Sequence, residues 1–174
     1  MSNWILDKDH SEVEFRVKHM MISNIKGQFQ EFDITLNVPN NDLTNASAEA
    51  VINTASVDTK NSQRDDHLRS GDFFDSEKFP KITFKSTKFE KVDDEDYKLT
   101  GDLTIQDTTK SIVLNVEYGG IAADPWGNQK AGFSFNGKIK RSEFGLTWNA
   151  ALETGGVMVS DEVRINGEIQ FVVK

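Results

Sequence analysis

Most of this chain alternates apolar and polar side chains with a period of two residues, and this pattern constrains its fold more than any other feature. A two-residue period is typical of β-strands, in which successive side chains point to opposite faces of a sheet. The alternation is clearest in residues 12–19, 97–106, 112–118, 133–140 and 162–173. It is less regular near residues 26–38, 46–54 and 81–91. The pattern therefore predicts about eight strands, each with one apolar and one polar face.

Strands with one apolar face bury that face either by stacking as two sheets or by closing into a barrel. Several of the predicted strands are about ten residues long, which favours a barrel, and closure leaves no unpaired edge strand. No Pro-, Gly- or Ser-rich linker divides the sequence. We therefore predict an all-β protein in which residues 1–174 form a single eight-stranded antiparallel barrel.

Two segments depart from the strand pattern. Residues 61–70 have the features of one short helix, with Ser62 in the position of an N-cap and Gly71 as the stop signal. Between Phe29 and Phe32 the apolar positions change phase, which predicts a β-bulge in that strand.

Two Asn-Gly pairs, Asn136-Gly137 and Asn166-Gly167, carry the strongest short signal for a β-hairpin. A hairpin at the first pair would set Phe135 beside Lys138 on one face, and the second pair has the same conflict. Continuous strands keep the alternation intact through both pairs. We therefore predict that both pairs lie within strands.

Continuous strands place Gly101, Gly137 and Gly167 mid-strand on the apolar face. Glycine at such a position marks a bend or a close approach by another group. One interpretation is that these glycines permit the strong coiling of a small barrel. The other is that the missing side chains leave a channel along the barrel axis, as in eight-stranded barrels that hold one small ligand.

Composition limits the partners of the chain. Its formal net charge of -8 argues against nucleic acids and anionic membrane surfaces. It has no cysteine, which excludes disulfides and thiolate chemistry. No run of 18 apolar residues is present, so we expect no membrane span, and no secretory signal opens the chain, so we expect a cytoplasmic location.

The sequence offers little support for catalysis. His10, His19 and His67 lack the spacing of metal-binding motifs, and motifs for nucleotide binding or nucleophilic hydrolysis are absent. His19 falls on an inward face, where a hydrogen-bonded core histidine is the commoner role. We predict no metal, no cofactor and no catalytic residue.

An apolar ligand cavity would be lined by inward aliphatic and aromatic side chains with a few polar groups at its opening. The expected walls are Phe15, Val17, Phe29, Leu103, Phe133, Phe135, Gly137, Ile139, Phe144 and Trp148. The expected polar contacts near an opening are His19, His67, Arg69 and Arg141.

Several of these residues belong to motifs that are spread over the chain. The first is Trp4-x-x-Asp7-x-x-His10-Ser11-x-Val13-x-Phe15-x-Val17-x-His19, and the most specific is Asp66-His67-Leu68-Arg69-Ser70-x-Asp72-Phe73-Phe74-Asp75. Gly101-x-Leu103-Thr104-Ile105 and Lys140-Arg141-Ser142-x-Phe144-Gly145-Leu146 follow in order. In these motifs the chain resembles the YceI-like polyisoprenoid-binding family.

The resemblance implies a lipocalin-like eight-stranded barrel, often a homodimer, whose interior holds a polyisoprenoid, an isoprenoid quinone or a similar lipid. It favours the channel over simple coiling as the role of the three inward glycines. We therefore expect the protein to sequester or transport a long-chain apolar ligand. Two alternatives stay open: an enzyme that acts on a lipid-like substrate through His19, and an interaction module whose barrel is filled by its own side chains.

Overall fold

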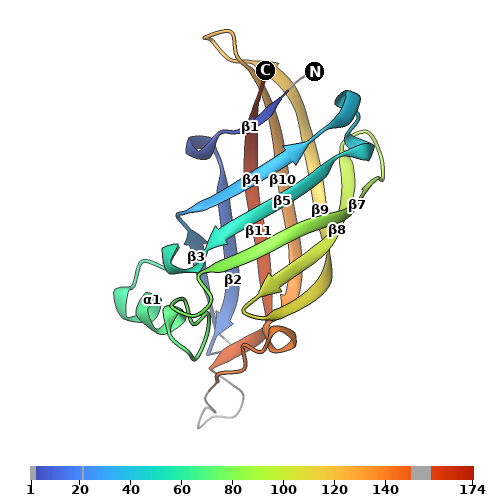
Figure 1. The fold of residues 1–174 in the computed structure, drawn as a ribbon. Helices are drawn as coiled ribbons and strands as arrows, with labels where there is room; N and C mark the ends of the chain where they lie inside the picture. Colours follow the sequence, from blue (N-terminus) through green and yellow to red (C-terminus); the bar gives the residue numbers. More distant parts are fainter. Residues whose placement is uncertain (1–2, 21, 150–157) are drawn as a thin grey trace.

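The computed structural model describes residues 3–20, 22–149 and 158–174, and most of them lie in β-strands (Figure 1). The strands are β1 (Trp4–Leu6), β2 (Glu12–His19), β3 (Ser23–Phe29), β4 (Phe32–Asn37), β5 (Ser47–Asn53), β6 (Val57–Asp58), β7 (Lys81–Lys91), β8 (Asp96–Ile105), β9 (Thr108–Ala123), β10 (Gln129–Lys140) and β11 (Val159–Val173). All their pairings are antiparallel.

The sheet closes into a barrel because β11 is long enough to pair with two strands. Its first part pairs with β2, and its last residues pair with β1, which also pairs with β4. In space, β1 and β2 form one interrupted strand, as do β3 and β4, and β5 and β6. The predicted eight-stranded antiparallel barrel is therefore confirmed, with three of its strands broken in two.

Each break has a local cause. Between β1 and β2 the chain makes a short 3-10 helix, η1 (Lys8–His10), and Ser11 Oγ donates to the carbonyl of Asp7 at 2.7 Å. The same hydroxyl accepts from the backbone N–H of Gln170 on β11 at 3.0 Å, so both halves stay on that strand. The second break separates β3 from β4 after Phe29, where the sequence predicted a β-bulge within a continuous strand, and η4 (Thr54–Ser56) makes the third.

The predicted helix is present as α1 (Ser62–Arg69). Its N-cap is Asn61 and not Ser62, because the Asn61 side chain accepts from the backbone N–H of Arg64 at 3.0 Å. Ser70, and not Gly71, caps its other end. The remaining 3-10 helices are η2 (Pro39–Asn41), η3 (Leu43–Asn45) and η5 (Arg141–Phe144).

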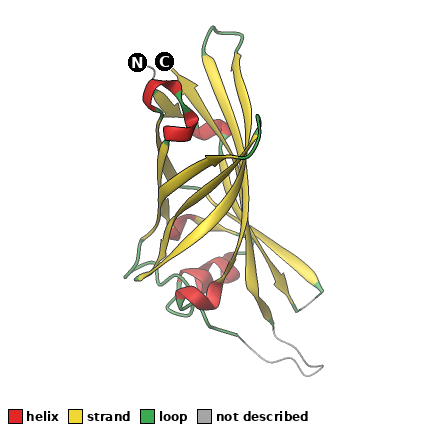
Figure 2. Ribbon diagram, turned by 90° about the vertical axis from the view of Figure 1, so that its right-hand side faces the viewer, coloured by secondary structure: helices red, strands yellow, loops and turns green. Residues whose placement is uncertain are grey.

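Asp65 anchors α1 to the barrel. Although charged, it is buried, and its Oδ1 accepts from the backbone N–H of Thr59 at 2.8 Å and from the Thr59 hydroxyl at 2.5 Å. Hydrogen bonds of this kind offset the cost of removing a carboxylate from water. The helix is thereby held at one end of the barrel, and both chain termini lie at the other end (Figures 1 and 2).

Both Asn-Gly pairs lie within strands, as predicted. The ladder between β10 and β11 runs without interruption from Gln129 opposite Val173 to Lys140 opposite Glu162. Within it, Asn136 faces Asn166.

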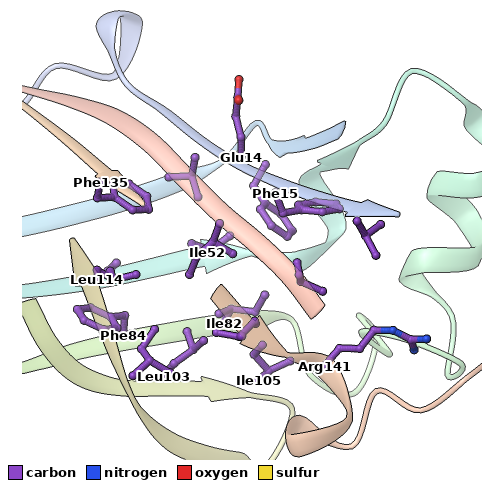
Figure 3. Close-up of a pocket in the computed structure, with 18 of the residues that line it drawn as sticks. Glu14, Phe15, Ile52, Ile82, Phe84, Leu103, Ile105, Leu114, Phe135 and Arg141 are labelled. Carbon is purple, nitrogen blue, oxygen red and sulfur yellow. The ribbon is translucent and has the colours of Figure 1, made fainter. Parts of the chain in front are cut away.

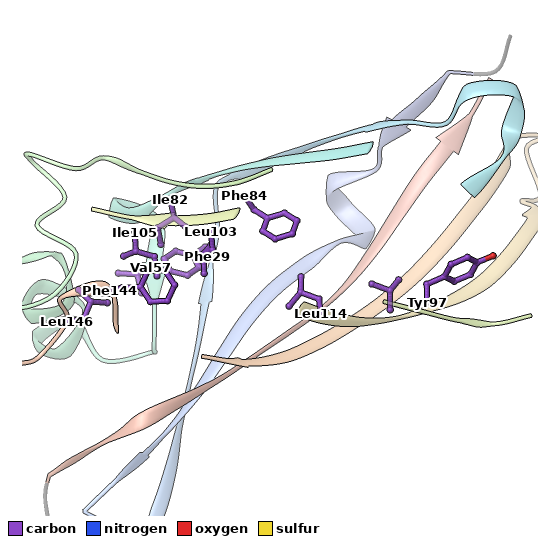
Figure 4. Close-up of a cluster of buried hydrophobic side chains, with 11 residues drawn as sticks. Phe29, Val57, Ile82, Phe84, Tyr97, Leu103, Ile105, Leu114, Phe144 and Leu146 are labelled. Atoms are coloured by element: carbon purple, nitrogen blue, oxygen red, sulfur yellow. The ribbon is translucent and has the colours of Figure 1, made fainter. Parts of the chain in front are cut away.

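Two apolar clusters occupy the barrel. The larger includes Val57 and Phe144, each only 1% exposed, and extends along the inside of the barrel to Tyr97 (Figure 4). The smaller surrounds Trp4 at the end that carries the termini. The Trp4 ring lies 6.3 Å from Phe133 and 6.4 Å from Phe171, centroid to centroid, which closes that end of the barrel.

Asp7 adds a polar contact near the closure. Its carboxylate accepts from Lys130 Nζ on β10 and contacts His10 Nδ1 at 2.9 Å. The hydrogen bond from Lys130 is the main reason that the pKa of Asp7 lies below its ordinary value; burial opposes the shift and His10 adds to it.

We expect Asp7→Asn to lower the free energy of unfolding at pH 7 by about 2 kcal/mol, because it weakens charge-assisted hydrogen bonds. A lowered folded-state pKa stabilises the fold above the unfolded-state value of about 3.9, and this contribution is lost as the pH falls through the folded-state value. The difference in free energy of unfolding between Asp7→Asn and the parent should therefore shrink below about pH 4. Urea unfolding at pH 7 and pH 3 measures both values, with exposed Asp9→Asn as the control. A difference that is the same at both pH values would contradict this role of the Asp7 charge.

Candidate ligand-binding site

A cavity of about 610 Å³ lies inside the barrel. All eight strands of the barrel contribute inward side chains to its wall, most of them aliphatic or aromatic (Figure 3). The volume is within the range of about 300–1,000 Å³ that is usual for ligand pockets. The barrel interior is therefore hollow and not filled by its own side chains.

The opening of the cavity lies beside the first turn of α1. Among the described residues that line the cavity, Asn61 and Gln63 are the two that are exposed to solvent. Other polar lining residues also gather at this end of the barrel: Arg64 and His67 from α1, His19 at the end of β2, and Arg141 from η5. The cavity is therefore apolar along its depth and polar around its opening.

Glu14 also borders the cavity, but it belongs to the outer surface. Its carboxylate lies 3.3 Å from Lys26 Nζ and accepts from Asn166 Nδ2 at 3.3 Å. Figure 3 shows this carboxylate pointing away from the other labelled side chains. It adds no charge to the interior of the cavity.

Arg141 is buried at the α1 end, with 5% of its surface exposed. Its guanidinium donates to four backbone carbonyls, those of Leu146 and Trp148 at 2.8 Å, Ser160 at 2.9 Å and Val159 at 3.1 Å. Burial lowers the pKa of Arg141, and nearby Asp161 opposes this shift. Since a guanidinium has five N–H groups, most of its donors serve to hold the segment after η5 against the start of β11.

His67 and Arg69 of α1 have different positions. The His67 ring lines the cavity, packs against Trp148 and Phe73 at 4.6 and 5.1 Å between centroids, and contacts Asp72 at 2.9 Å through Nε2. Arg69 does not line the cavity. It donates to the carbonyls of Ala55 at 2.9 Å and Val57 at 3.3 Å, and so fastens α1 to the barrel wall.

The inward glycines lie beneath neighbouring side chains. A Cβ atom on Gly101 would lie 2.4 Å from the Phe84 ring, one on Gly167 would lie 2.5 Å from the Phe135 ring, and one on Gly137 would lie 2.6 Å from Leu114 Cδ2. A fourth inward glycine, Gly27, lies under Phe15 in the same way, at 2.3 Å.

The sequence predicted that the missing side chains of the glycines leave a channel along the axis. This is wrong in detail, because the space next to each glycine is filled by a neighbouring side chain. The missing side chains let bulky neighbours lie flat against the barrel wall, as in the aromatic packing over glycine known from other sheets. The axis of the barrel stays open because those side chains do not extend into it.

The described residues contain no group of three or more His, Cys, Asp or Glu side chains that could hold a metal ion. Nor does any helix among them have the length and apolar character needed to cross a membrane.

The family model of the YceI-like domain matches residues 4–171. This chain belongs to the YceI-like family. A UPF0312 protein of Staphylococcus aureus (strain bovine RF122 / ET3-1) is 39% identical over 174 residues, which cover 99% of each chain.

Solved structures of similar proteins share the barrel. The YceI protein of Campylobacter jejuni is 39% identical with a TM-score of 0.75, covering 100% of this chain and 99% of that one. BcnA of Burkholderia cenocepacia is 25% identical with a TM-score of 0.82, covering 95% and 98%. A polyisoprenoid binding domain from Saccharophagus degradans has the same fold at 15% identity, with a TM-score of 0.72 and full coverage of both chains. These similarities confirm the lipocalin-like architecture.

In this YceI-like domain, the motifs that carried the resemblance lie at the breaks in the strands and around the opening. The motif that begins at Trp4 holds the junction of β1 and β2, through Asp7 and Ser11. The motif 66–75 forms the second half of α1 and the loop after it, and the motif 140–146 forms η5 with the clamping Arg141.

The structure places eleven of the predicted site residues of the YceI-like domain at the cavity. They are Phe15, Val17, His19, Phe29, His67, Leu103, Phe133, Phe135, Ile139, Arg141 and Trp148. Three others do not line it: Arg69 faces the wall behind α1, Gly137 is covered by Leu114, and Phe144 is enclosed in the core. Arg141 lies just after the end of β10, as expected, but it is buried and its guanidinium donates to backbone carbonyls instead of being open to a ligand.

The sequence prediction missed much of the wall opposite β10 and β11. The inward residues of β4, β5 and β7 line the cavity, among them Ile34, Ala50 and Phe84. The same two-residue alternation would have identified them. Asn61, Gln63 and Arg64 were also missed, and no periodic pattern marks them because they lie at the start of the short helix α1.

The packing over the glycines predicts different effects for two alanine substitutions. In Gly167→Ala the new Cβ would lie 2.3 Å from the backbone carbonyl of Glu12, which cannot rotate away. In Gly137→Ala it would meet mainly the flexible end of Leu114. We expect Gly167→Ala to lower the free energy of unfolding by about 1–3 kcal/mol and Gly137→Ala by less than about 1 kcal/mol, measured by urea denaturation. Equal losses in the two variants would show that these contacts do not set the packing of the wall.

Proposed function

We propose that this protein binds a long-chain apolar ligand inside its barrel and sequesters or transports it. The ligand class is a polyisoprenoid, an isoprenoid quinone or a similar lipid. The observation that supports this proposal is the size and lining of the cavity. It has a volume of about 610 Å³, its interior is apolar, and its polar residues gather at one opening.

The wall favours hydrocarbon over polar ligands. A polar group placed deep in the cavity would lose its hydrogen bonds to water and find few partners in the wall, which is unfavourable. Each methylene group of a hydrocarbon chain transferred into the cavity contributes about 0.8 kcal/mol, and the ordering of a flexible chain opposes part of this gain. Affinity should therefore increase with chain length until the cavity is full.

The opening suits a small polar head group. Gln63 is exposed there, and Arg64 uses its Nε and Nη2 atoms to contact Thr59, each at 2.7 Å, which leaves further N–H groups of the guanidinium. A head group held beside α1 would keep its contact with water. The similar fold of the polyisoprenoid binding domain from Saccharophagus degradans supports the same ligand class.

We propose a carrier and not an enzyme. Two histidines border the cavity, His19 and His67, and the second is already engaged by Asp72. General acid–base catalysis would need one of them within hydrogen-bond distance of the reacting atoms. Turnover of a lipid-like substrate that disappears in His19→Ala would overturn this part of the proposal.

Ala50→Phe tests the cavity directly. Ala50 lines the cavity between Ile34 and Phe84 on the neighbouring strands, so a phenyl ring there would occupy space that the ligand needs. We expect binding of a fluorescent prenyl probe to weaken at least about tenfold, which corresponds to about 1.4 kcal/mol.

Glu49→Phe is the matched control, because it adds the same ring at the adjacent exposed position on the outer face of β5. Its probe affinity should stay within about twofold of the parent. Equal affinity in the parent and Ala50→Phe would place the probe outside the cavity.

Native mass spectrometry of the purified protein tests the ligand class. We expect the intact protein to carry a bound species. After solvent extraction, the released molecule should have the mass of a long-chain lipid. Repeated preparations without lipid, together with no uptake of prenyl probes, would contradict the proposed function.

A further inference from the structure

The β2–β3 hairpin has an exposed apolar tip. Of the residues described there, Ile22 is 85% exposed and Met20 is 43% exposed. The hairpin lies at the α1 end of the barrel, since the adjacent His19 lines the cavity and pairs with Val159 at the start of β11. The apolar tip is therefore close to the polar end of the cavity.

A row of basic residues crosses the outer face of the barrel below this tip. The register sets Lys26 opposite Arg16, Arg16 opposite Arg164, and Arg164 opposite Lys138, which gives four adjacent cations on β3, β2, β11 and β10. Lys18 lies on the same face of β2, between this row and the tip.

Positive charges outnumber negative charges along this row. Lys26 contacts Glu14 at 3.3 Å, and Glu162 contacts both Lys138 at 3.6 Å and Arg164 at 3.8 Å. Within the described part of the chain, Arg16 and Lys18 make no ion pair. Like charges directly opposite each other destabilise a sheet, so the fold alone does not account for this arrangement.

Along β2 the outer face therefore changes character in steps. It begins with Glu12 and Glu14, continues with Arg16 and Lys18, and ends at the apolar tip. At about 3.3 Å per residue, Lys18 and Arg16 lie roughly 7 and 13 Å from Met20 along the strand. Interfacial elements place apolar side chains about 5–10 Å into a membrane surface, which would bring both cations to the level of the phosphates.

We propose that this face, defined by Met20, Ile22, Lys18 and the cation row, docks on an anionic lipid bilayer. The apolar tip enters the interface and the cations contact lipid phosphates. This inference rests on the proposed function, because it brings the opening beside α1 close to the membrane from which a lipid carrier exchanges its ligand.

The net charge of -8 argues against anionic membranes only as a sum over the whole chain, whereas a docking surface acts through its local charge. At physiological salt, charges separated by more than about 8 Å of solvent are largely screened. A bilayer surface therefore interacts mainly with the residues that face it, and on this face five cations outnumber Glu14 and Glu162. The cations are Arg16, Lys18, Lys26, Lys138 and Arg164.

Vesicle flotation tests the proposal. We expect the parent protein to float with vesicles of equal parts phosphatidylglycerol and phosphatidylcholine, and not with phosphatidylcholine alone. Binding should decrease when the salt concentration is raised. Arg16→Gln/Arg164→Gln and Met20→Ser/Ile22→Ser should each reduce the bound fraction several-fold.

Two matched controls make the result specific. Lys85→Gln/Lys98→Gln removes two exposed cations from β7 and β8. Trp126→Ser removes a side chain that is 82% exposed in the turn between β9 and β10, at the end of the barrel opposite α1. Both controls should bind anionic vesicles like the parent.

Several outcomes would overturn the docking surface. They are equal binding to both vesicle types, no binding to either, and equal losses in the control variants. Loss of binding in the charge variant alone would indicate an acidic partner other than a bilayer, and would also overturn it.

Prenyl-probe binding in vesicle-free solution separates this inference from the proposed function. None of the four substituted positions of the docking variants lines the cavity, so probe binding by these variants should match the parent. Vesicle binding without any probe binding would leave the docking surface standing and contradict the carrier function.

Discussion

The pairing of β11 with both β1 and β2 is the interaction on which the rest of the structure depends. Without it the sheet would have two free edges, and its apolar face would need a second layer to cover it. Closure instead directs the inward face of all eight strands toward one axis. An eight-stranded barrel encloses an interior just wide enough to be filled by side chains or to hold one small ligand. The inward residues therefore decide between a filled and a hollow barrel.

Four inward glycines shift this balance toward a hollow barrel. Phe15 lies over Gly27, Phe84 over Gly101 and Phe135 over Gly167, so three rings lie along the wall and not across the axis. Glycine weakens a strand, and the contact of the ring with the bare backbone recovers part of that loss. The same arrangement thus supports the wall and keeps the cavity open.

The strands could be predicted from the sequence because a two-residue alternation is a local signal, readable one segment at a time. Roles that depend on distant partners could not. Arg141 donates to carbonyls of residues 146, 148, 159 and 160, and Arg69 donates to residues 55 and 57. No spacing in the sequence distinguishes such anchoring arginines from ones that face a ligand. The N-cap at Asn61 was placed one residue late for a simpler reason: Asn and Ser are both favoured at that position.

The features on which both proposals rest lie at one end of the barrel. The exposed start of α1 marks the opening, Arg141 holds the adjoining segment in place, and the β2–β3 hairpin adds an apolar tip above a cation row. The opposite end is closed around Trp4. A ligand that is almost insoluble in water needs a short path between membrane and cavity, and this path is shortest when the opening and the membrane-facing surface share one end. In the docking proposed above, the distribution of charge along β2, from acidic to basic to apolar, would orient the barrel in that way, which a net charge summed over the whole chain conceals.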